Sequence, residues 1–293
     1  MFVTTLLSGP ESAGFGSAPV EAVRAAWDGG PVRWLASGVA AEFPMPRIPP
    51  DRWQVWADLQ ARGVDLIVQR AAGCRRRVLI ADMDSTMIGQ ESLDELAAEA
   101  GVGEKVAAIT ARAMNGELDF GAALRERVGL LAGLDAGAIA RVCANRISLR
   151  PGARQLVATM KANGGYSALV SGGFTVFSGH VAAALGFDEH HANILNIRAG
   201  RLTGTVAEPI LGRDAKGAVL RAILARKGLT TDDVMAVGDG ANDLGMLGLA
   251  GAGVAFHAKP AVAAECDLRI NHGDLTALLY IQGYRRDEFA ASA

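Results

Sequence analysis

The chain has 293 residues, half of them hydrophobic and a fifth charged, and its formal net charge is −2. This composition is typical of a folded protein with one large domain or two smaller ones, and it argues against a disordered chain. With so little net charge and a single short basic run, at 75–77, we expect no nucleic-acid partner.

The first residues predict neither export nor membrane insertion. Residues 1–7 lack the basic region of a secretory signal, and no apolar run approaches the ~20 residues of a membrane helix. Three well-separated cysteines without a CxxC pair indicate neither a disulfide framework nor a zinc site. We therefore expect a cytoplasmic protein that does not bind membranes.

Residues 1–74 are predicted to form a small α+β unit. Its elements follow the order βαββαβ, which is typical of a ferredoxin-like fold. The predicted strands are 2–7, 32–43 with a turn at 37–38, and 64–68, and the predicted helices are 20–27 and 51–60, the second with Asp51 as its N-cap.

From residue 75 to residue 293 the pattern is that of an α/β domain with a parallel sheet. A strand at 78–81 precedes a long helical stretch, 91–146, which we interpret as a helical cap inserted at about 89–148. The later predicted elements are helices at 152–162, 174–185, 215–227 and 243–249, strands at 166–170, 233–237 and 252–255, and a hairpin at 193–207.

Polar residues follow three of the predicted strands directly. Open parallel sheets bind ligands outside the carboxyl ends of their strands, so we expect these residues to converge. They are Asp82 and Asp84 after the first strand, Ser171-Gly172-Gly173 after the second, and the stretch from Gly238 to Asp243 after the third.

The acidic residues in this set predict a divalent cation. Asp82, Asp84, Asp239 and Asp243 would place four carboxylates in one crevice, where they cannot all ionise without a counter-charge. Mg²⁺ prefers carboxylates, water and phosphate oxygens. An isolated turn or a calcium loop is the alternative, but an EF-hand needs glycine at the position of Met87.

The remaining residues predict a phosphate site. Ser171 offers a hydroxyl, Gly172 offers a backbone N–H, and Lys216 offers a positive charge. Arg213 and Arg221 are alternative cations close to Lys216 in the chain. A phosphoryl group placed among these residues could be transferred to one carboxylate while its neighbour handles protons.

In this order the motifs resemble those of the haloacid dehalogenase superfamily of phosphatases. The similarity extends from residue 78 to about 280, and within the superfamily it is greatest to the phosphoserine phosphatase family. The resemblance implies a Rossmann-like parallel sheet with a helical cap inserted after the first motif. The residues that carry it are Asp82-Met83-Asp84-Ser85-Thr86, Glu91, Met114-Asn115-Gly116, Asp119-Phe120, the run from Leu124 to Val128, Ser171-Gly172-Gly173, Lys216 and Gly238 to Asp243.

The resemblance also implies a role for each site residue. Asp82 would be the nucleophile and Asp84 the general acid and base. Mg²⁺ would be held by Asp82, the backbone carbonyl of Asp84, and Asp239; phosphate would be held by Ser171, Gly172, Lys216 and Asn242, with Asp243 in support.

The cap would select the substrate. The resemblance implies that Glu91 binds the ammonium group of O-phospho-L-serine and Arg127 its carboxylate, with Met114 and Phe120 lining the pocket. The reaction would be the last step of serine biosynthesis, through an aspartyl-phosphate. Glu91 could instead be a helix-terminal acid, and Arg127 an i,i+4 partner on a solvated face; Arg125 is a neighbouring cation that could be mistaken for Arg127. The alternative function is hydrolysis or transfer of another small phosphomonoester.

The order of elements in residues 1–74 is also similar to that of ACT-type amino-acid-binding modules. The resemblance rests on the pattern and on no motif. It leaves two roles open for this unit, namely binding serine and pairing two copies into a homodimer.

Overall fold

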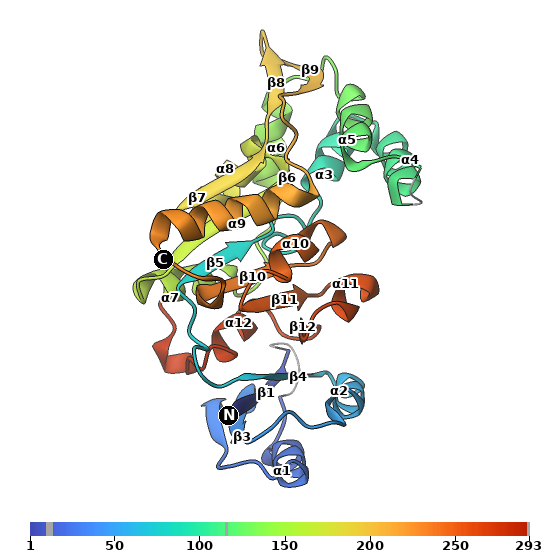
Figure 1. Cartoon of the computed structure of the whole chain (residues 1–293). Helices are drawn as coiled ribbons and strands as arrows, with labels where there is room; N and C mark the ends of the chain where they lie inside the picture. Colours follow the sequence, from blue (N-terminus) through green and yellow to red (C-terminus); the bar gives the residue numbers. More distant parts are fainter. Residues whose placement is uncertain (10–13, 115–116, 292–293) are drawn as a thin grey trace.

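The computed structural model describes residues 1–9, 14–114 and 117–291; the side chains of Met114 and Arg213 are not among the described parts. Three regions follow one another in space (Figure 1). A small α+β unit lies at one end, a parallel sheet flanked by helices lies in the middle, and a group of short helices lies at the other end.

The N-terminal unit has the predicted order βαββαβ. Its four strands form an antiparallel sheet in the order β2-β3-β1-β4. Asp51 occupies the N-cap position of its second helix, but its carboxylate accepts a hydrogen bond from Trp27 Nε1 at 3.1 Å, so the predicted side-chain cap is absent. The elements are β1 (Phe2–Ser8), α1 (Ser17–Ala26), β2 (Arg33–Ala36), β3 (Ala40–Met45), α2 (Arg52–Gln60) and β4 (Val64–Arg70).

Both faces of this sheet are covered. Leu6 and Phe43 pack with residues of α1 and α2, whereas Leu7 and Ile67, which point to the opposite face, join the main core beside Tyr280. The two units therefore share a continuous apolar core. Their division into 1–74 and 75–293 remains a prediction.

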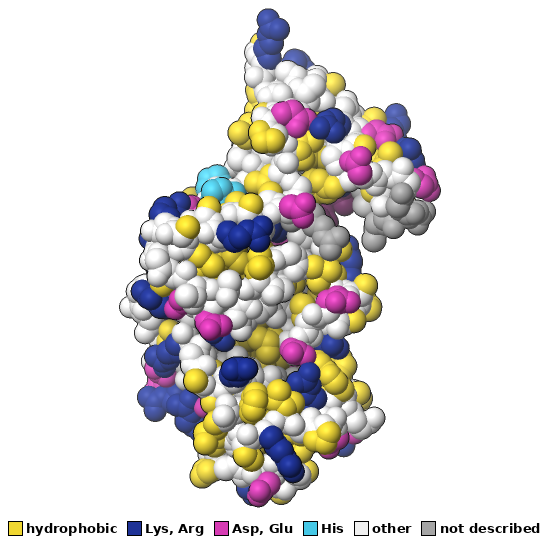
Figure 2. Space-filling model, in the orientation of Figure 1, with side chains coloured by type: hydrophobic (Ala, Val, Ile, Leu, Met, Phe, Trp, Pro, Cys, Tyr) yellow, Lys and Arg dark blue, Asp and Glu magenta, His cyan; other side chains and the backbone are white. Residues whose placement is uncertain are grey.

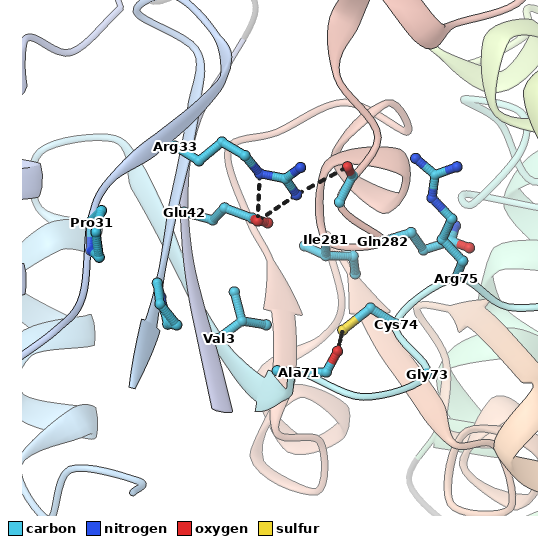
Figure 3. A pocket seen from close by; sticks show the side chains of 12 residues that line it. Val3, Pro31, Arg33, Glu42, Ala71, Gly73, Cys74, Arg75, Ile281 and Gln282 are labelled. Carbon is cyan, nitrogen blue, oxygen red and sulfur yellow. Dashed lines mark hydrogen bonds and ion pairs between the residues drawn. The ribbon is translucent and has the colours of Figure 1, made fainter. Parts of the chain in front are cut away.

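Beside this shared core, the junction contains an open crevice of about 670 Å³ (Figure 3). Arg33 on β2 donates hydrogen bonds to the Glu42 carboxylate at 2.6 Å and to the Gly283 carbonyl at 3.4 Å. The Arg33 guanidinium thus links the N-terminal sheet to the C-terminal part of the chain.

The central sheet has six parallel strands in the order β12-β11-β10-β5-β6-β7. The four middle strands are those predicted. The two edge strands were not predicted, because β7 has a polar sequence and β12 has only three residues. The bounds are β5 (Val78–Ala81), β6 (Tyr166–Phe174), β7 (Glu189–Asn193), β10 (Val234–Gly238), β11 (Ala252–Phe256) and β12 (Leu268–Ile270).

Helices cover both faces of the central sheet. Apolar residues of α7, α8 and α12 pack on one face with Leu79 and Met235, and those of α9, α10 and α11 pack on the other with Val78 and Ile80. The helices are α7 (Ala153–Ala162), α8 (Thr175–Leu185), α9 (Arg213–Lys227), α10 (Leu244–Leu247), α11 (Pro260–Ala264) and α12 (Ala277–Tyr280).

The predicted cap is present, and its described residues between β5 and α7 form four short helices. The two chain segments that join it to the core pair with each other, since Gly89 donates to the Ser148 carbonyl and Arg150 donates to the Met87 carbonyl. A hairpin, β8 (Leu195–Arg198) and β9 (Arg201–Val206), packs beside the cap (Figure 1). The cap helices are α3 (Ser92–Glu99), α4 (Gly103–Met114), α5 (Phe120–Gly129) and α6 (Gly137–Asn145).

None of the helices in the described part of the chain has the length and apolar character needed to cross a bilayer. On the face seen in Figure 2, acidic and basic side chains are interspersed over all three regions.

Candidate active site

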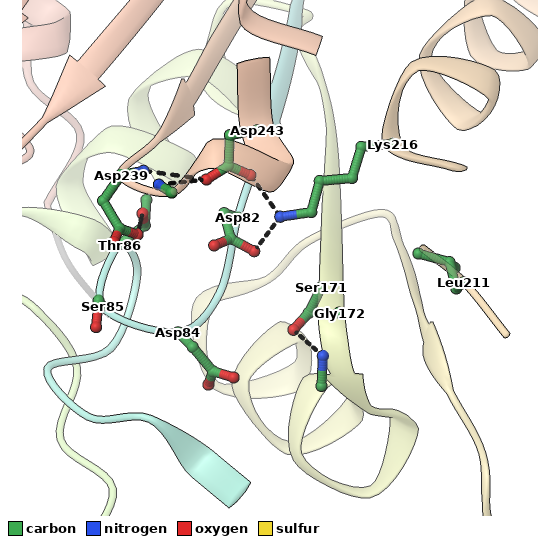
Figure 4. A network of polar contacts seen from close by, with 12 residues as sticks. Asp82, Asp84, Ser85, Thr86, Ser171, Gly172, Leu211, Lys216, Asp239 and Asp243 are labelled. Atoms are coloured by element: carbon green, nitrogen blue, oxygen red, sulfur yellow. Dashed lines mark hydrogen bonds and ion pairs between the residues drawn. The ribbon is translucent and has the colours of Figure 1, made fainter. Parts of the chain in front are cut away.

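The polar residues that follow the predicted strands converge at one edge of the sheet (Figure 4). This convergence follows from the strand order, because β5 lies between β10 and β6 and all three strands run in the same direction. The converging residues are Asp82 and Asp84 after β5, Ser171 and Gly172 in the last part of β6, Asp239 and Asp243 after β10, and Lys216 from α9.

Lys216 lies between two aspartates. Its Nζ is 2.5 Å from Asp82 Oδ1 and 2.5 Å from Asp243 Oδ1, and the residue is only 1% exposed. Burial alone would favour the neutral amine, but the two carboxylates outweigh it and raise the pKa of Lys216 to about 12. Lys216 therefore supplies the buried positive charge, whereas Arg221 is exposed.

Asp243 contacts both Lys216 and the backbone of the turn after β10. Its second oxygen, Oδ2, accepts hydrogen bonds from the backbone N–H groups of Asp239 and Gly240, at 3.1 and 2.9 Å. A Cβ atom at Gly238 would lie 2.4 Å from the Asp243 carboxyl carbon, so this position requires glycine. Asp243 thus ties the turn after β10 to Lys216.

The pKa values in this cluster indicate a shortage of positive charge. Burial raises the pKa of Asp239 to about 6, although the Thr86 hydroxyl donates to its carboxylate at 2.9 Å. Burial and the neighbouring Asp243 carboxylate also raise the pKa of Asp82, despite its contact with Lys216. A bound cation would reverse both shifts.

A metal ion fits this group of oxygens. One carboxylate oxygen from each of Asp82, Asp239 and Asp243 lies within 4.8 Å of the other two. Hard oxygen donors of this kind are those that Mg²⁺ prefers. The carboxylate of Asp84 is directed to Ser92 instead, which leaves its backbone carbonyl for the metal role that the resemblance implies.

Asp84 has the properties of a proton donor near neutral pH. Its carboxylate accepts hydrogen bonds from the backbone N–H and the hydroxyl of Ser92, at 3.2 and 3.0 Å. Burial, with a further contribution from the Glu91 carboxylate, raises the pKa of Asp84 to about 7. A carboxyl group with this pKa can donate a proton and later accept one.

The phosphate-binding residues lie at the end of β6. Ser171 is 1% exposed, and its Oγ accepts a hydrogen bond from the Gly173 N–H at 2.9 Å. A Cβ atom at Gly172 would lie 3.2 Å from the ring of Phe120, which places that cap residue directly over the loop. Asn242 is half-buried in the turn after β10.

Three residues that hold this arrangement were not predicted as site residues. Thr86 binds the carboxylate of Asp239, and Ser92 binds that of Asp84. The available signal was that both hydroxyl residues follow Asp84 within eight positions of the chain. Asn193, at the end of β7, is 2% exposed. It had no local signal, since its strand was not predicted.

Asn193 connects the two phosphate-binding segments. Its amide nitrogen donates to the Gly172 carbonyl at 2.9 Å and to the Leu211 carbonyl at 3.3 Å. Its amide oxygen accepts from the Leu211 N–H at 2.7 Å. The Ser171 loop and the segment that leads into α9 and Lys216 are therefore held together by one buried side chain.

Two of the predicted substrate residues, Glu91 and Arg127, carry opposite charges and lie at the start of α3 and in α5 of the cap. Glu91, at the N-cap of α3, is exposed and accepts a hydrogen bond from Ser85 Oγ at 2.8 Å. Arg127 is half-buried. Burial lowers its pKa, whereas the carboxylates of Asp94 and Glu91 act in the opposite direction. The Glu91 carboxylate is therefore close enough to act on the Arg127 guanidinium, and the substrate roles of both residues stay predictions. Phe120 is 36% exposed. The Met114 side chain lies outside the described residues.

The model of the haloacid dehalogenase-like hydrolase family matches residues 79–248. A phosphoserine phosphatase from Streptomyces coelicolor is 43% identical over 263 residues, which are 89% of this chain and 62% of the relative. This and two further curated relatives are longer, since the chain spans 62%, 63% and 53% of their lengths.

Two solved structures are similar over most of their lengths. A hydrolase of the same family from Salmonella enterica serovar Typhi has a TM-score of 0.86 and 29% identity, with 96% of this chain and 98% of that one covered. A phosphoserine phosphatase solved as an analogue of its phospho-aspartyl intermediate has a TM-score of 0.65 and 39% identity, with 70% of this chain and 98% of that one covered.

Proposed function

The chain belongs to the haloacid dehalogenase-like hydrolase family, and from this premise we propose that it hydrolyses O-phospho-L-serine to L-serine and phosphate with Mg²⁺. The observation that carries the proposal is the combination of two groups of residues. The buried cluster around Asp82 and Lys216 fits phosphoryl transfer, and the opposite charges of Glu91 and Arg127, which are close enough to interact electrostatically, fit a zwitterionic amino acid.

Asp82 is the nucleophile in this proposal. One of its oxygens is bound to Lys216, and the other would attack phosphorus as the bond to the serine oxygen breaks, forming an aspartyl-phosphate. Ser171, Gly172 and Lys216 would hold the phosphoryl oxygens. The solved intermediate analogue of a 39% identical phosphatase supports this step.

Asp84 would move the protons. In the first step its carboxyl group, with a pKa of about 7, gives its proton to the departing serine oxygen. In the second step the resulting carboxylate takes a proton from water while the water oxygen attacks phosphorus. The phosphate then leaves, and Asp82 is restored as a carboxylate.

Mg²⁺ would be held by Asp82, Asp239 and the backbone carbonyl of Asp84. When bound, it supplies positive charge that keeps Asp82 ionised and neutralises the phosphoryl oxygens. The raised pKa values of Asp82 and Asp239 support this role, because they show two carboxylates that a cation would stabilise.

The substrate can be tested with three phosphomonoesters that differ by single groups. Phosphoserine carries both an ammonium and a carboxylate; phosphoethanolamine lacks the carboxylate that Arg127 would bind; 3-phosphoglycerate lacks the ammonium that Glu91 would bind. We expect phosphoserine to have the highest kcat/KM in an assay of phosphate release, and activity to depend on Mg²⁺. A higher kcat/KM for another ester would contradict the proposed substrate.

The same assay separates hydrolysis from transfer. With an added alcohol as acceptor, a hydrolase still releases one phosphate for each serine formed, whereas a phosphotransferase releases less phosphate than serine. The expected ratio of one supports hydrolysis. The proposed reaction would complete serine biosynthesis in the cytoplasm.

For residues 1–74 we propose one of the two roles that the resemblance leaves open. Calorimetry of the full chain with L-serine tests binding, and light scattering tests whether two copies pair. The strand β2 lies at the free edge of the N-terminal sheet, where a second copy could add its own strand. If neither serine binding nor pairing is found, both roles are excluded.

A further inference from the structure

Asp65, in the N-terminal unit, is a fully buried carboxylate that faces the central domain. It follows the first residue of β4 and shares a strand face with Ile67, which belongs to the main core. An acidic residue at 0% exposure is costly to bury unless it is hydrogen-bonded. The partners of Asp65 therefore indicate why it is there.

Three backbone N–H groups of the central domain bind this carboxylate. Asn271 donates to Oδ1 at 2.9 Å, and His272 and Gly273 donate to Oδ2 at 3.0 and 2.8 Å. Gln60 of the same unit donates to Oδ1 at 3.2 Å. Residues 271–273 follow β12, so Asp65 fixes a loop at the edge of the sheet where the strand carboxyl ends lie.

The fixed loop in turn holds His257. The Gly273 carbonyl lies 2.8 Å from His257 Nε2, and since a carbonyl only accepts, this nitrogen carries the hydrogen. The His257 backbone N–H donates to the Ile270 carbonyl at 2.7 Å. These bonds keep His257 at φ 45°, a left-handed conformation that non-glycine residues rarely adopt without support.

The left-handed residue directs the following segment to the candidate active site. Two residues after His257, the Lys259 backbone N–H donates to the Asp239 carbonyl at 3.3 Å. Asp239 is one of the carboxylates that would hold Mg²⁺. A continuous series of hydrogen bonds thus joins Asp65 to Asp239 through residues 271–273 and 257–259.

We propose that Asp65 is a positioning residue for Asp239, through which the N-terminal unit sets the geometry of the metal-binding turn. The proposal rests on the proposed function only in taking Asp239 as a metal ligand. One other contact at the junction lies away from this path: Arg52 forms an ion pair with Asp267 at 2.8 Å, before β12 begins. Arg52 therefore provides a matched control.

The test uses the full chain and two readouts that need no catalysis. Amide hydrogen exchange reports on residues 239–243 and 257–259, and calorimetry with Mg²⁺ alone reports on the metal site. In Asp65→Asn we expect exchange in both segments to quicken on the order of ten-fold and Mg²⁺ affinity to fall on the order of five-fold. Arg52→Ala is expected to leave both segments at the wild-type rates.

Variants of His257 test the middle of the path independently of the junction. His257→Ala is expected to reproduce both effects, and His257→Gln, which keeps a side-chain N–H of similar reach, to restore most of the lost Mg²⁺ affinity. Adding Asp65→Asn to His257→Ala is expected to cause little further loss, because both break the same path.

Each outcome is decisive. If Asp65→Asn lowers the melting temperature but leaves exchange at 239–243 and Mg²⁺ affinity unchanged, Asp65 only anchors the N-terminal unit and the proposal is wrong. If Asp65→Asn does not fold, wild-type behaviour of His257→Ala overturns it. If the wild type hydrolyses no phosphomonoester, the proposed function fails, and the exchange measurements still decide the role of Asp65.

Discussion

The strand-end cluster and the cap contribute to the same candidate site, but their side chains are held very differently. In the cluster, Lys216 is 1% exposed and bound to two aspartates. In the cap, Glu91 is exposed and Arg127 is half-buried, bound through Nε to the Ala123 carbonyl. The first arrangement is preorganised for one charge distribution, whereas the second leaves its charged groups accessible to a ligand.

The difference suggests that the buried cluster carries out the chemistry and that the cap selects the substrate. Buried groups act strongly on a phosphoryl group because little water screens them. Arg127 binds the backbone of its own helix, so replacing it leaves the hydrogen bonds of the cluster in place. We therefore expect substitutions in the cluster to reduce the turnover of every ester, and substitutions in the cap to alter the preference among esters.

The largest expected effect is that of Asp82→Asn. An amide cannot form the aspartyl-phosphate, so we expect phosphate release from all esters to fall by ~10⁴-fold or more. The melting temperature serves as the control for folding. If a folded Asp82→Asn protein retained turnover, Asp82 would not be the nucleophile, and the assignment of the chemistry to the cluster and of selectivity to the cap would be wrong.

Lys216→Ala is expected to be the next most severe substitution. It removes the partner of two buried carboxylates, which costs ~3 kcal/mol of unfolding free energy, and it lowers kcat/KM by roughly 10³-fold for all esters. Denaturant unfolding and phosphate release measure the two effects. Lys227→Ala, an exposed position in the same helix, is the matched control; equal effects of the two substitutions would contradict the assignment.

Arg127→Gln tests the cap. Loss of a charge-assisted contact with the substrate carboxylate is expected to raise KM for phosphoserine roughly 30-fold while KM for phosphoethanolamine changes little. Arg125→Gln is the control, because Arg125 pairs with Glu208 at 2.6 Å on the surface. If Arg127→Gln raises KM equally for both esters, Arg127 does not bind the substrate carboxylate.

The smallest of the four effects is expected for Asn193→Ala. It leaves the Gly172 carbonyl and the Leu211 N–H without their buried partner, and we expect kcat/KM to fall ~10-fold for every ester. Inhibition by inorganic phosphate is expected to weaken by a similar factor. Asn196→Ala, on the neighbouring hairpin, is the control. If kcat/KM fell for phosphoserine alone, Asn193 would contribute to substrate selectivity, as the cap does, and not to phosphate binding.

The sequence predicted the cluster more completely than the residues that support it. Asp82, Ser171 and Asp239 each follow a run of apolar residues, and that pattern is readable along the chain. Asn193 is the last residue of a polar edge strand and Asp65 interrupts an apolar strand, so neither matched a motif. Their backbone partners lie 18 residues or more away in the chain, where no local pattern can indicate them.

By itself, the sequence indicated the four middle strands of the central sheet, a cap inserted after the first of them, and the charged residues at the strand ends, because hydrophobic periodicity and strand-end motifs are local properties. Only the tertiary structure decided the edge strands β7 and β12, the orientation of the Asp84 carboxylate toward Ser92, and the contact of Asp65 with residues 271–273. These features depend on which segments become neighbours after folding, and buried polar groups must then find partners among them.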